Sequence, residues 1–341
     1  MNRPSASTRA ITGALFLLLG CASGGHRDVA GTGGSGGEAT GGKGSGGAAT
    51  GGAAGAAEDA GPPDAEPIDE PDPTSDGGPP SGQGGDAGSA PPPSPTTTTP
   101  SAACGSGKPA PAQGYHTIMV GTLARKYILR LPASYDGKKP WPVIFAFHGA
   151  GGQDATTFDT KFGFRAANGD KAVLVFGEAL PRPQGGRSWM VDTAANMAYM
   201  DAVIAWLKDN VCIDSSRLFA TGQSSGGYFS QTLGCQRGHV FRAVAPSSGG
   251  IRDFVNCMGN PGVWMSHGKT DSGTAKDVAD AKAYWLEHKK CTTMTKPVDP
   301  SPCVEYQGCV DNIPFVFCEH PGGHPWPDYA TKGVWTFFSR F

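Results

Sequence analysis

Residues 222–226 hold the first side chains that could do chemistry, a serine between two glycines in the order Gly-Gln-Ser-Ser-Gly. A serine hydroxyl is a weak nucleophile until a neighbouring base removes its proton and an acid orients that base. On a sharp turn between a strand and a helix, flanking glycines allow tight packing and the hydroxyl projects above the sheet. Ser224 is therefore the candidate nucleophile.

The same GxSxG pattern occurs at residues 33–37, so the pattern alone is weak evidence in a chain with 52 glycines. Ser224 differs from that copy in its surroundings. An apolar run at 218–220 precedes it, and side chains at helical spacing in 228–233 follow it. A nucleophile turn requires this order of strand, turn and helix, so we interpret the copy at 33–37 as coincidental.

An acid and then a histidine should follow the serine along the chain. Asp271 is the candidate acid because it lies in the turn directly after an apolar run at 263–266. Three other carboxylates are expected to face solvent: Asp253, Asp277 and Asp280.

Three histidines follow the acid and could act as the base: His288, His320 and His324. His324 lies in Gly-Gly-His-Pro-Trp-Pro, a stiff loop between the last expected strand and the final helix, and it is the candidate base. His320 is the alternative. His288 lies late in a charged helical segment and is expected to face water, while His267, which precedes the acid, is expected to order that turn.

Attack on a carbonyl carbon places negative charge on its oxygen, which backbone amides already in position can stabilise. One donor is expected at Ser225, directly after the nucleophile. The other is expected at Ala150, in the glycine-rich turn His-Gly-Ala-Gly-Gly at 148–152. A phosphate-binding loop is the alternative for this turn, but no Gly-Lys-Ser or Gly-Lys-Thr follows it.

Short apolar runs alternate with longer helical patterns, which favours an α/β fold with a mainly parallel sheet and helices on both faces. Strands are expected at 127–131, 142–147, 172–176, 218–220, 241–245, 262–266 and 315–318. Helices are expected at 197–211, after Ser224, at 275–288 and near the C-terminus.

Residues 22–103 consist mostly of Gly, Ala, Ser, Thr, Pro, Asp and Glu and contain no Phe, Tyr or Trp. Such a segment cannot bury enough apolar surface to offset the entropy of folding. We therefore expect a disordered tether over 21–103 and one folded domain over 104–341. The net charge of −2, from 28 basic and 30 acidic residues, provides no basic surface for nucleic acid.

The N-terminus is typical of a secretory signal, with Arg3 and Arg9 before an apolar run at 14–19 that is too short to span a bilayer. Leu-Leu-Gly-Cys at 18–21 resembles a bacterial lipobox. We expect a signal peptide over 1–20, acylation of Cys21 and a lipid anchor that holds the secreted domain on a membrane, with an ordinary signal peptide as the alternative.

Nine cysteines are present, and the eight after Cys21 form an even set in a chain that leaves the cytosol, which favours disulfides. Zinc is the alternative, but there is no CxxC pair and no histidine at ligand spacing. We expect neither a metal nor a cofactor. The sequence does not choose among the many possible pairings.

From residue 114 onward, the sequence resembles the secreted esterases grouped as feruloyl esterases, acetylxylan esterases and extracellular polyhydroxybutyrate depolymerases. The resemblance rests on FHGAGG at 147–152, CIDSSRLFATGQSSGG at 212–227, HGKTD at 267–271 and GGHPWP at 322–327. SPCVEYQGC at 301–309, followed by Cys318, looks most like feruloyl esterases. The resemblance implies an α/β-hydrolase fold and a triad of Ser224, Asp271 and His324.

It also implies a carboxylic ester as substrate, with hydroxycinnamoyl esters of plant-wall sugars expected first. Hydroxyalkanoate oligomers and acetylated xylan are the alternatives, and a catalytically silent surface-binding lipoprotein is a third interpretation. Trp189 and Trp326 are expected to lie near the site, where a flat acyl ring could pack on them. We expect no separate substrate-binding module after the catalytic domain, a departure from the polymer-degrading members.

Overall fold

The computed structural model describes residues 98–341. The predicted signal peptide, the acylated Cys21 and almost the whole tether lie outside these residues and stay predictions. The chain already packs on the domain at Thr99, whose amide donates to Asp214 Oδ1 at 2.9 Å and whose carbonyl accepts from the Ser215 amide at 2.8 Å. The packed part therefore begins slightly before Cys104, where the sequence predicted the boundary.

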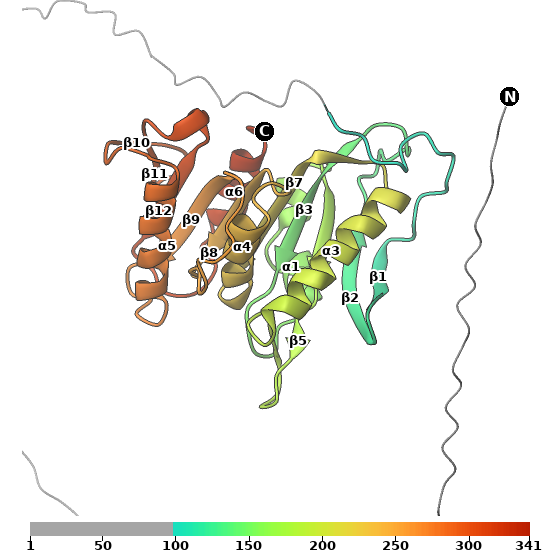
Figure 1. Ribbon diagram of the computed structural model, residues 1–341, viewed down its shortest axis with the longest axis horizontal. Coiled ribbons are helices and arrows are strands. Elements are labelled where there is room, and N and C mark those ends of the chain that lie inside the picture. Colours follow the sequence, from blue (N-terminus) through green and yellow to red (C-terminus); the bar gives the residue numbers. More distant parts are fainter. Residues whose placement is uncertain (1–97) are drawn as a thin grey trace, which may run out of the picture. The chain divides into compact units, whose positions relative to one another are not determined.

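Within residues 98–341, one ten-stranded sheet has the order β1-β2-β4-β3-β7-β8-β9-β12-β11-β10 (Figure 1). The central strands pair in parallel: β4 (Val173–Gly177), β3 (Trp141–Phe147), β7 (Ile213–Gln223), β8 (Ala243–Ser247), β9 (Gly262–Gly268) and β12 (Phe315–His320). Antiparallel strands flank them: β1 (Gly114–Val120) and β2 (Leu123–Arg130) at one edge, β11 (Cys303–Tyr306) and β10 (Thr295–Pro297) at the other. A separate small hairpin pairs β5 (Leu180–Pro181) with β6 (Arg187–Ser188). The predicted mainly parallel sheet is confirmed.

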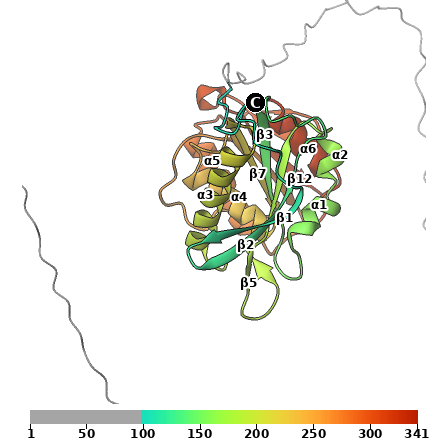
Figure 2. The same cartoon turned by 90° about the vertical axis from the view of Figure 1, so that its right-hand side faces the viewer.

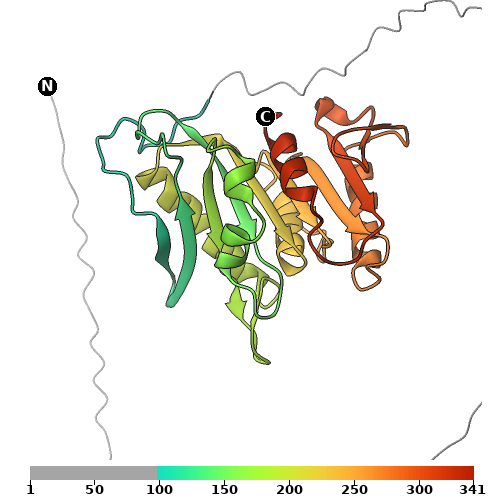
Figure 3. The same cartoon turned by 180° about the vertical axis from the view of Figure 1, so that it is seen from behind.

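Helices cover both faces of the sheet (Figures 2 and 3). One face carries α3 (Thr193–Asn210), α4 (Ser225–Gln236) and α5 (Ala275–His288). The other carries α1 (Ala155–Thr160), α2 (Phe164–Ala167) and α6 (Ala330–Phe338). A 3₁₀ turn at Val310–Asn312 precedes β12.

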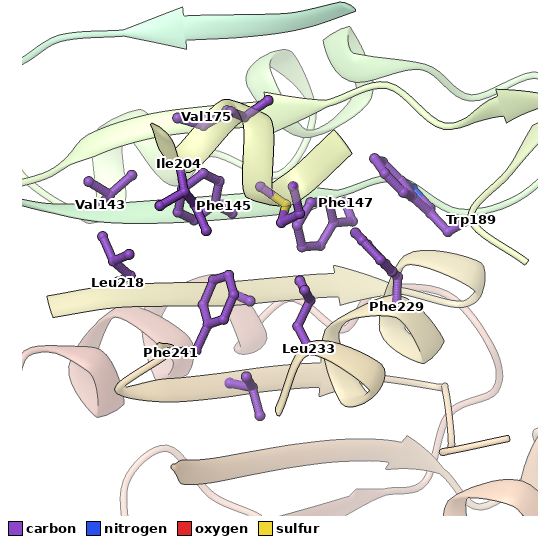
Figure 4. Close-up of a cluster of buried hydrophobic side chains, with 14 of the residues drawn as sticks. Val143, Phe145, Phe147, Val175, Trp189, Ile204, Leu218, Phe229, Leu233 and Phe241 are labelled. Atoms are coloured by element: carbon purple, nitrogen blue, oxygen red, sulfur yellow. The ribbon is translucent and has the colours of Figure 1, made fainter. Parts of the chain in front are cut away.

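The two cores follow from the alternation of side chains along buried strands. In β3, Val143, Phe145 and Phe147 point to the core beneath α3 and α4 (Figure 4). Ile144 and Ala146 point to the core beneath α1 and α6. Because both faces are covered, every position of β3 is buried, which explains why this strand is a continuous apolar run.

Four disulfides pair the eight cysteines and confirm the predicted disulfide framework: Cys104–Cys212, Cys235–Cys257, Cys291–Cys309 and Cys303–Cys318. The first joins the segment that enters the domain to the start of β7. The second joins α4 to the loop after β8, and the other two fasten the edge formed by β10, β11 and β12. Over the same described range, no helix is both long and apolar enough to cross a membrane.

Candidate active site

Ser224 lies on a sharp turn between the end of β7 and the start of α4. Its backbone has φ 56° and ψ −120°, a conformation that residues other than glycine rarely adopt and that is common at functional sites. A Cβ on Gly226 would lie 2.0 Å from the carbonyl oxygen of Phe147, and one on Gly222 would lie 2.4 Å from the carbonyl oxygen of Gly226. Close backbone approach therefore requires glycine on both sides of Ser224.

The predicted acid and base meet in a short hydrogen bond. His324 Nδ1 lies 2.8 Å from Asp271 Oδ2, which also accepts from Thr274 Oγ1 at 2.6 Å. Burial would raise the pKa of Asp271, but the hydrogen bonds from Thr274 and His324 outweigh it and hold that pKa below its ordinary value. The carboxylate is thus ionised and fixes the ring of His324, whose side chain is 42% exposed.

The loop that carries His324 is fastened to the turn that carries Ser224. The side chain of Gln223 donates from Nε2 to the backbone oxygen of His324 at 2.9 Å. Ser224, Asp271 and His324 follow β7, β9 and β12 respectively, and the carboxyl ends of these parallel strands form one edge of the sheet. Sequence reasoning missed Gln223 and Thr274, because only tertiary contacts give these two side chains a role.

His320, the alternative base, lies in a different environment. Its ring is buried, Nδ1 accepts from the Gly322 amide at 3.2 Å, and no hydrogen bond joins it to Asp271 within residues 98–341. Burial, and then the nearby His267, lower its pKa. His267 also approaches the acid, with 3.7 Å between its Nε2 and Asp271 Oδ2. The contacts of His320 are those of a residue that shapes the loop.

Two backbone amides are predicted to stabilise an oxyanion, those of Ala150 and Ser225. Neither donates a hydrogen bond to an acceptor within the described part of the protein. The residues on either side of Ala150 are fixed. The Gly149 amide donates to Gln153 Oε1 at 2.9 Å, and Gly151 exchanges two backbone hydrogen bonds with Arg187. The turn thus holds an unpaired donor in a rigid frame, as an oxyanion hole requires.

His148 is buried and joins this turn to the segment after β4 by two hydrogen bonds. Its Nδ1 donates to the Gly149 carbonyl at 2.7 Å, and its Nε2 accepts from the Ala179 amide at 3.1 Å, so its partners define a neutral ring. Burial lowers the pKa of His148 to about 4. Protonation would leave the Ala179 amide facing a second donor.

This histidine should make the protein acid-sensitive. Between the unfolded pKa of about 6.5 and the folded pKa of about 4, the unfolded chain binds more protons, so the free energy of unfolding falls as pH falls. From pH 7 to pH 4, His148 alone lowers the free energy of unfolding by about 3 kcal/mol. In urea unfolding at both pH values, His148→Gln should be less stable at pH 7 but lose about 3 kcal/mol less on acidification. Parallel pH profiles for the two proteins would contradict this role.

The two predicted aromatic contacts differ in their surroundings. Trp189 is 1% exposed and packs between core rings, stacked on Phe229 at 4.8 Å and edge-on to Phe147 at 4.8 Å. Trp326 is half-buried against the rings of Phe158, Phe162 and Phe164. Neither is an open platform, so any contact of Trp189 with a ligand is limited to the cavity that it lines.

That cavity, of about 190 Å³, lies alongside α4. Its walls include Trp189, Tyr228, Phe229 and Thr232. No group of three His, Cys, Asp or Glu side chains that could hold a metal ion occurs in residues 98–341.

A nucleophile turn, an acid and a histidine, each after the carboxyl end of a different strand of a mainly parallel sheet, are typical of an α/β-hydrolase. The profile described as the prolyl oligopeptidase family matches residues 194–301. A probable feruloyl esterase C from Aspergillus flavus is 34% identical over 262 residues, which cover 70% of this chain and 90% of the relative. The corresponding protein from Aspergillus oryzae is 31% identical with the same coverage. The chain is a serine ester hydrolase and belongs to the feruloyl esterase family.

A solved structure, the acetyl xylan esterase from Aspergillus awamori, has the same fold with a TM-score of 0.55 at 14% identity. The superposition covers 67% of this chain and 100% of that structure. The predicted α/β-hydrolase fold is thereby confirmed.

Proposed function

We propose that the protein hydrolyses carboxylic esters through an acyl-enzyme on Ser224. This proposal rests on the hydrogen bond of 2.8 Å between His324 and Asp271. The loop that carries His324 is in turn joined to the Ser224 turn by the hydrogen bond from Gln223. Because Nδ1 of His324 bonds the acid, Nε2 is the atom left to act as the base. It takes the Ser224 proton as the hydroxyl oxygen attacks the ester carbon.

The amides of Ala150 and Ser225 stabilise the negative oxygen of the tetrahedral intermediate, and His324 then gives its proton to the departing alcohol. Water enters, loses a proton to the same nitrogen and attacks the acyl carbon. The carboxylic acid leaves and the proton returns to Ser224. Each donor in the oxyanion hole is worth roughly 2.7–4 kcal/mol of transition-state stabilisation in enzymes of this kind.

We further propose that the acyl group is hydroxycinnamoyl, as in feruloyl esters of plant-wall sugars. Two observations support it: the relatives named feruloyl esterase C and the cavity beside α4. The Tyr228 amide donates to the Ser224 carbonyl at 2.9 Å, so the cavity wall at Tyr228 begins about one helical turn, roughly 5 Å along the axis, from the nucleophile. A volume of about 190 Å³ exceeds the roughly 150 Å³ that accommodates benzene.

In this proposal, Trp189 forms part of the cavity wall and does not stack on the substrate ring from an open surface. The aromatic ring of the acyl group binds in the cavity beside α4. Trp326 packs on the opposite core, against α1 and α2. We therefore expect Trp326→Ala to affect methyl ferulate and methyl acetate alike.

Filling the cavity tests the substrate assignment. Thr232→Phe should lower kcat/KM for methyl ferulate by about tenfold or more and leave methyl acetate nearly unchanged, because only the aromatic acyl group uses this space. Thr336→Phe, the same substitution at an exposed position of α6, is the matched control and should change neither value.

A different result would redirect the assignment. Equal kcat/KM for the two esters in the wild-type protein, or a preference for 3-hydroxybutyrate oligomers, would reject the feruloyl substrate. Acetylated xylan or hydroxyalkanoate oligomers would then become the leading candidates. Loss of both activities in Thr232→Phe with normal folding would move the acyl site elsewhere.

The location that we propose is extracytoplasmic. Four disulfides within residues 98–341 support it, because such a framework is stable in oxidising compartments and rare in the cytosol.

A further inference from the structure

A second and larger cavity, of about 500 Å³, lies at the edge of the sheet where the parallel strands begin. Its walls include Trp141, the first residue of β3, and Arg217 in the first half of β7. Strand β3 runs from Trp141 to Phe147, roughly 20 Å at about 3.3 Å per residue, and the glycine-rich turn of the active site follows its far end. The cavity is therefore separate from the site at Ser224, and its volume is typical of ligand sites.

Aromatic side chains form the floor of this cavity: Trp141, Phe219, Trp335, Phe338 and Phe341. Trp335 is the partly exposed member, and Trp141 is 5% exposed. Although Trp141 is buried, its Nε1 donates to no group in residues 98–341. The Nε1 atom itself has almost no solvent-accessible surface, so Trp141 contributes its ring, and not this donor, to the cavity wall.

The rim is positively charged, with Lys139, Lys171 and Arg217 among the lining residues and Asp170 as the acidic one. Neither lysine forms an ion pair within the described chain, and the Lys139 ammonium lies 4.6 Å above the Trp141 ring. Asp170 already accepts a hydrogen bond from the Ala133 amide at 2.5 Å.

The side chain of Arg217 is held in place through Nε, which leaves its two terminal nitrogens able to bind a ligand. Its Nε donates to Asp214 Oδ2 at 2.6 Å, and its two terminal nitrogens have no hydrogen-bond partner among residues 98–341. A guanidinium anchored through Nε can offer those nitrogens to an incoming carboxylate. The cavity thus combines an aromatic floor with three cations at its rim.

We propose that this cavity binds an acidic sugar unit of a polysaccharide, a uronate. The C–H face of a pyranose ring packs on the partly exposed Trp335, and the carboxylate pairs with the lysines and Arg217. A neutral sugar leaves the cations unused. Such a site holds the enzyme on an anionic polymer at a point remote from Ser224, and it operates whichever acyl group the active site accepts.

Calorimetric titration with an oligogalacturonate tests this proposal, with xylopentaose as the neutral counterpart. The wild-type protein should bind the oligogalacturonate with an affinity that falls as salt rises, and xylopentaose at least about tenfold more weakly. The double variant Lys139→Gln/Lys171→Gln should lose about tenfold in affinity, and Trp335→Ala a similar factor. Lys332→Gln, an exposed lysine of α6 outside the cavity, should bind like wild type.

Hydrolysis of methyl ferulate, measured on the same proteins, should be unchanged in the double variant. This measurement distinguishes loss of oligosaccharide binding at the cavity from damage to the active site. Equal affinity for the two oligosaccharides would overturn the uronate assignment. Binding that the double variant and Trp335→Ala both retain in full would place the ligand elsewhere on the protein.

Discussion

Replacing Ser224 by alanine should lower kcat for methyl ferulate by at least about 10⁴-fold, because the proposed acyl-enzyme cannot form without the hydroxyl. The substitution removes one oxygen from a turn whose geometry is set by the glycines around it, so folding should be intact. Circular dichroism and thermal unfolding would verify this, and a stopped assay with high enzyme concentration would quantify the residual rate.

Ser230→Ala is the matched control for this variant. Ser230 lies on α4, the helix that follows the Ser224 turn. Its hydroxyl donates to the Gly226 carbonyl at 2.9 Å, so its loss should cost about 1 kcal/mol of stability and leave turnover close to wild type. Wild-type kcat in a correctly folded Ser224→Ala protein would refute the assignment of the nucleophile. Equal inactivation by both substitutions would indicate damage to α4 instead.

Replacing His324 by alanine should have a comparable effect, a loss of about 10⁴-fold in kcat. Within residues 98–341, no other histidine forms a hydrogen bond with Asp271 that could hold its ring in place as the base. The KM for methyl ferulate should change little, since the imidazole acts on the proton of Ser224 rather than on the acyl group. Steady-state kinetics at pH 7 to 8 would measure both constants.

His320→Gln is the informative comparison. Glutamine can still accept from the Gly322 amide, so the loop should keep its shape and kcat should fall by less than about tenfold. The reverse ranking, with His320→Gln far more damaging than His324→Ala at equal stability, would transfer the role of base to His320.

Local patterns predicted much of the fold because the signals that they carry are local. Helix α5 has the bounds expected from its apolar spacing, and β3 has a continuous apolar run because both of its faces are buried. By contrast, β1 was not expected. It is an edge strand whose side chains alternate between half-buried and exposed, so packing against β2 rather than an apolar run defines it. Helix α3 begins at Thr193, before its first large apolar side chain, where the Asp192 side chain caps it.

The sequence by itself determined which residues are candidates for chemistry: Ser224 by its glycine-flanked turn, Asp271 by its place after an apolar strand, and His324 by its stiff loop. These signals are readable because each depends on a few neighbouring residues and on chain order. The sequence also favoured disulfide pairing of the eight cysteines after Cys21, because their number is even and the N-terminus predicts secretion.

Only the tertiary structure decided which groups meet, since contacts between distant segments depend on the paths of all the strands between them. Folding brought His324 to 2.8 Å from Asp271, 53 residues away in sequence, and chose one set of disulfides. It buried Trp189 in the core, stacked on Phe229 and edge-on to Phe147, in a space that exists because Gly177 has no side chain there. It also assembled the cavity where the parallel strands begin, from segments around residues 139–142, 169–171, 217–219 and 335–341 that show no common pattern along the chain.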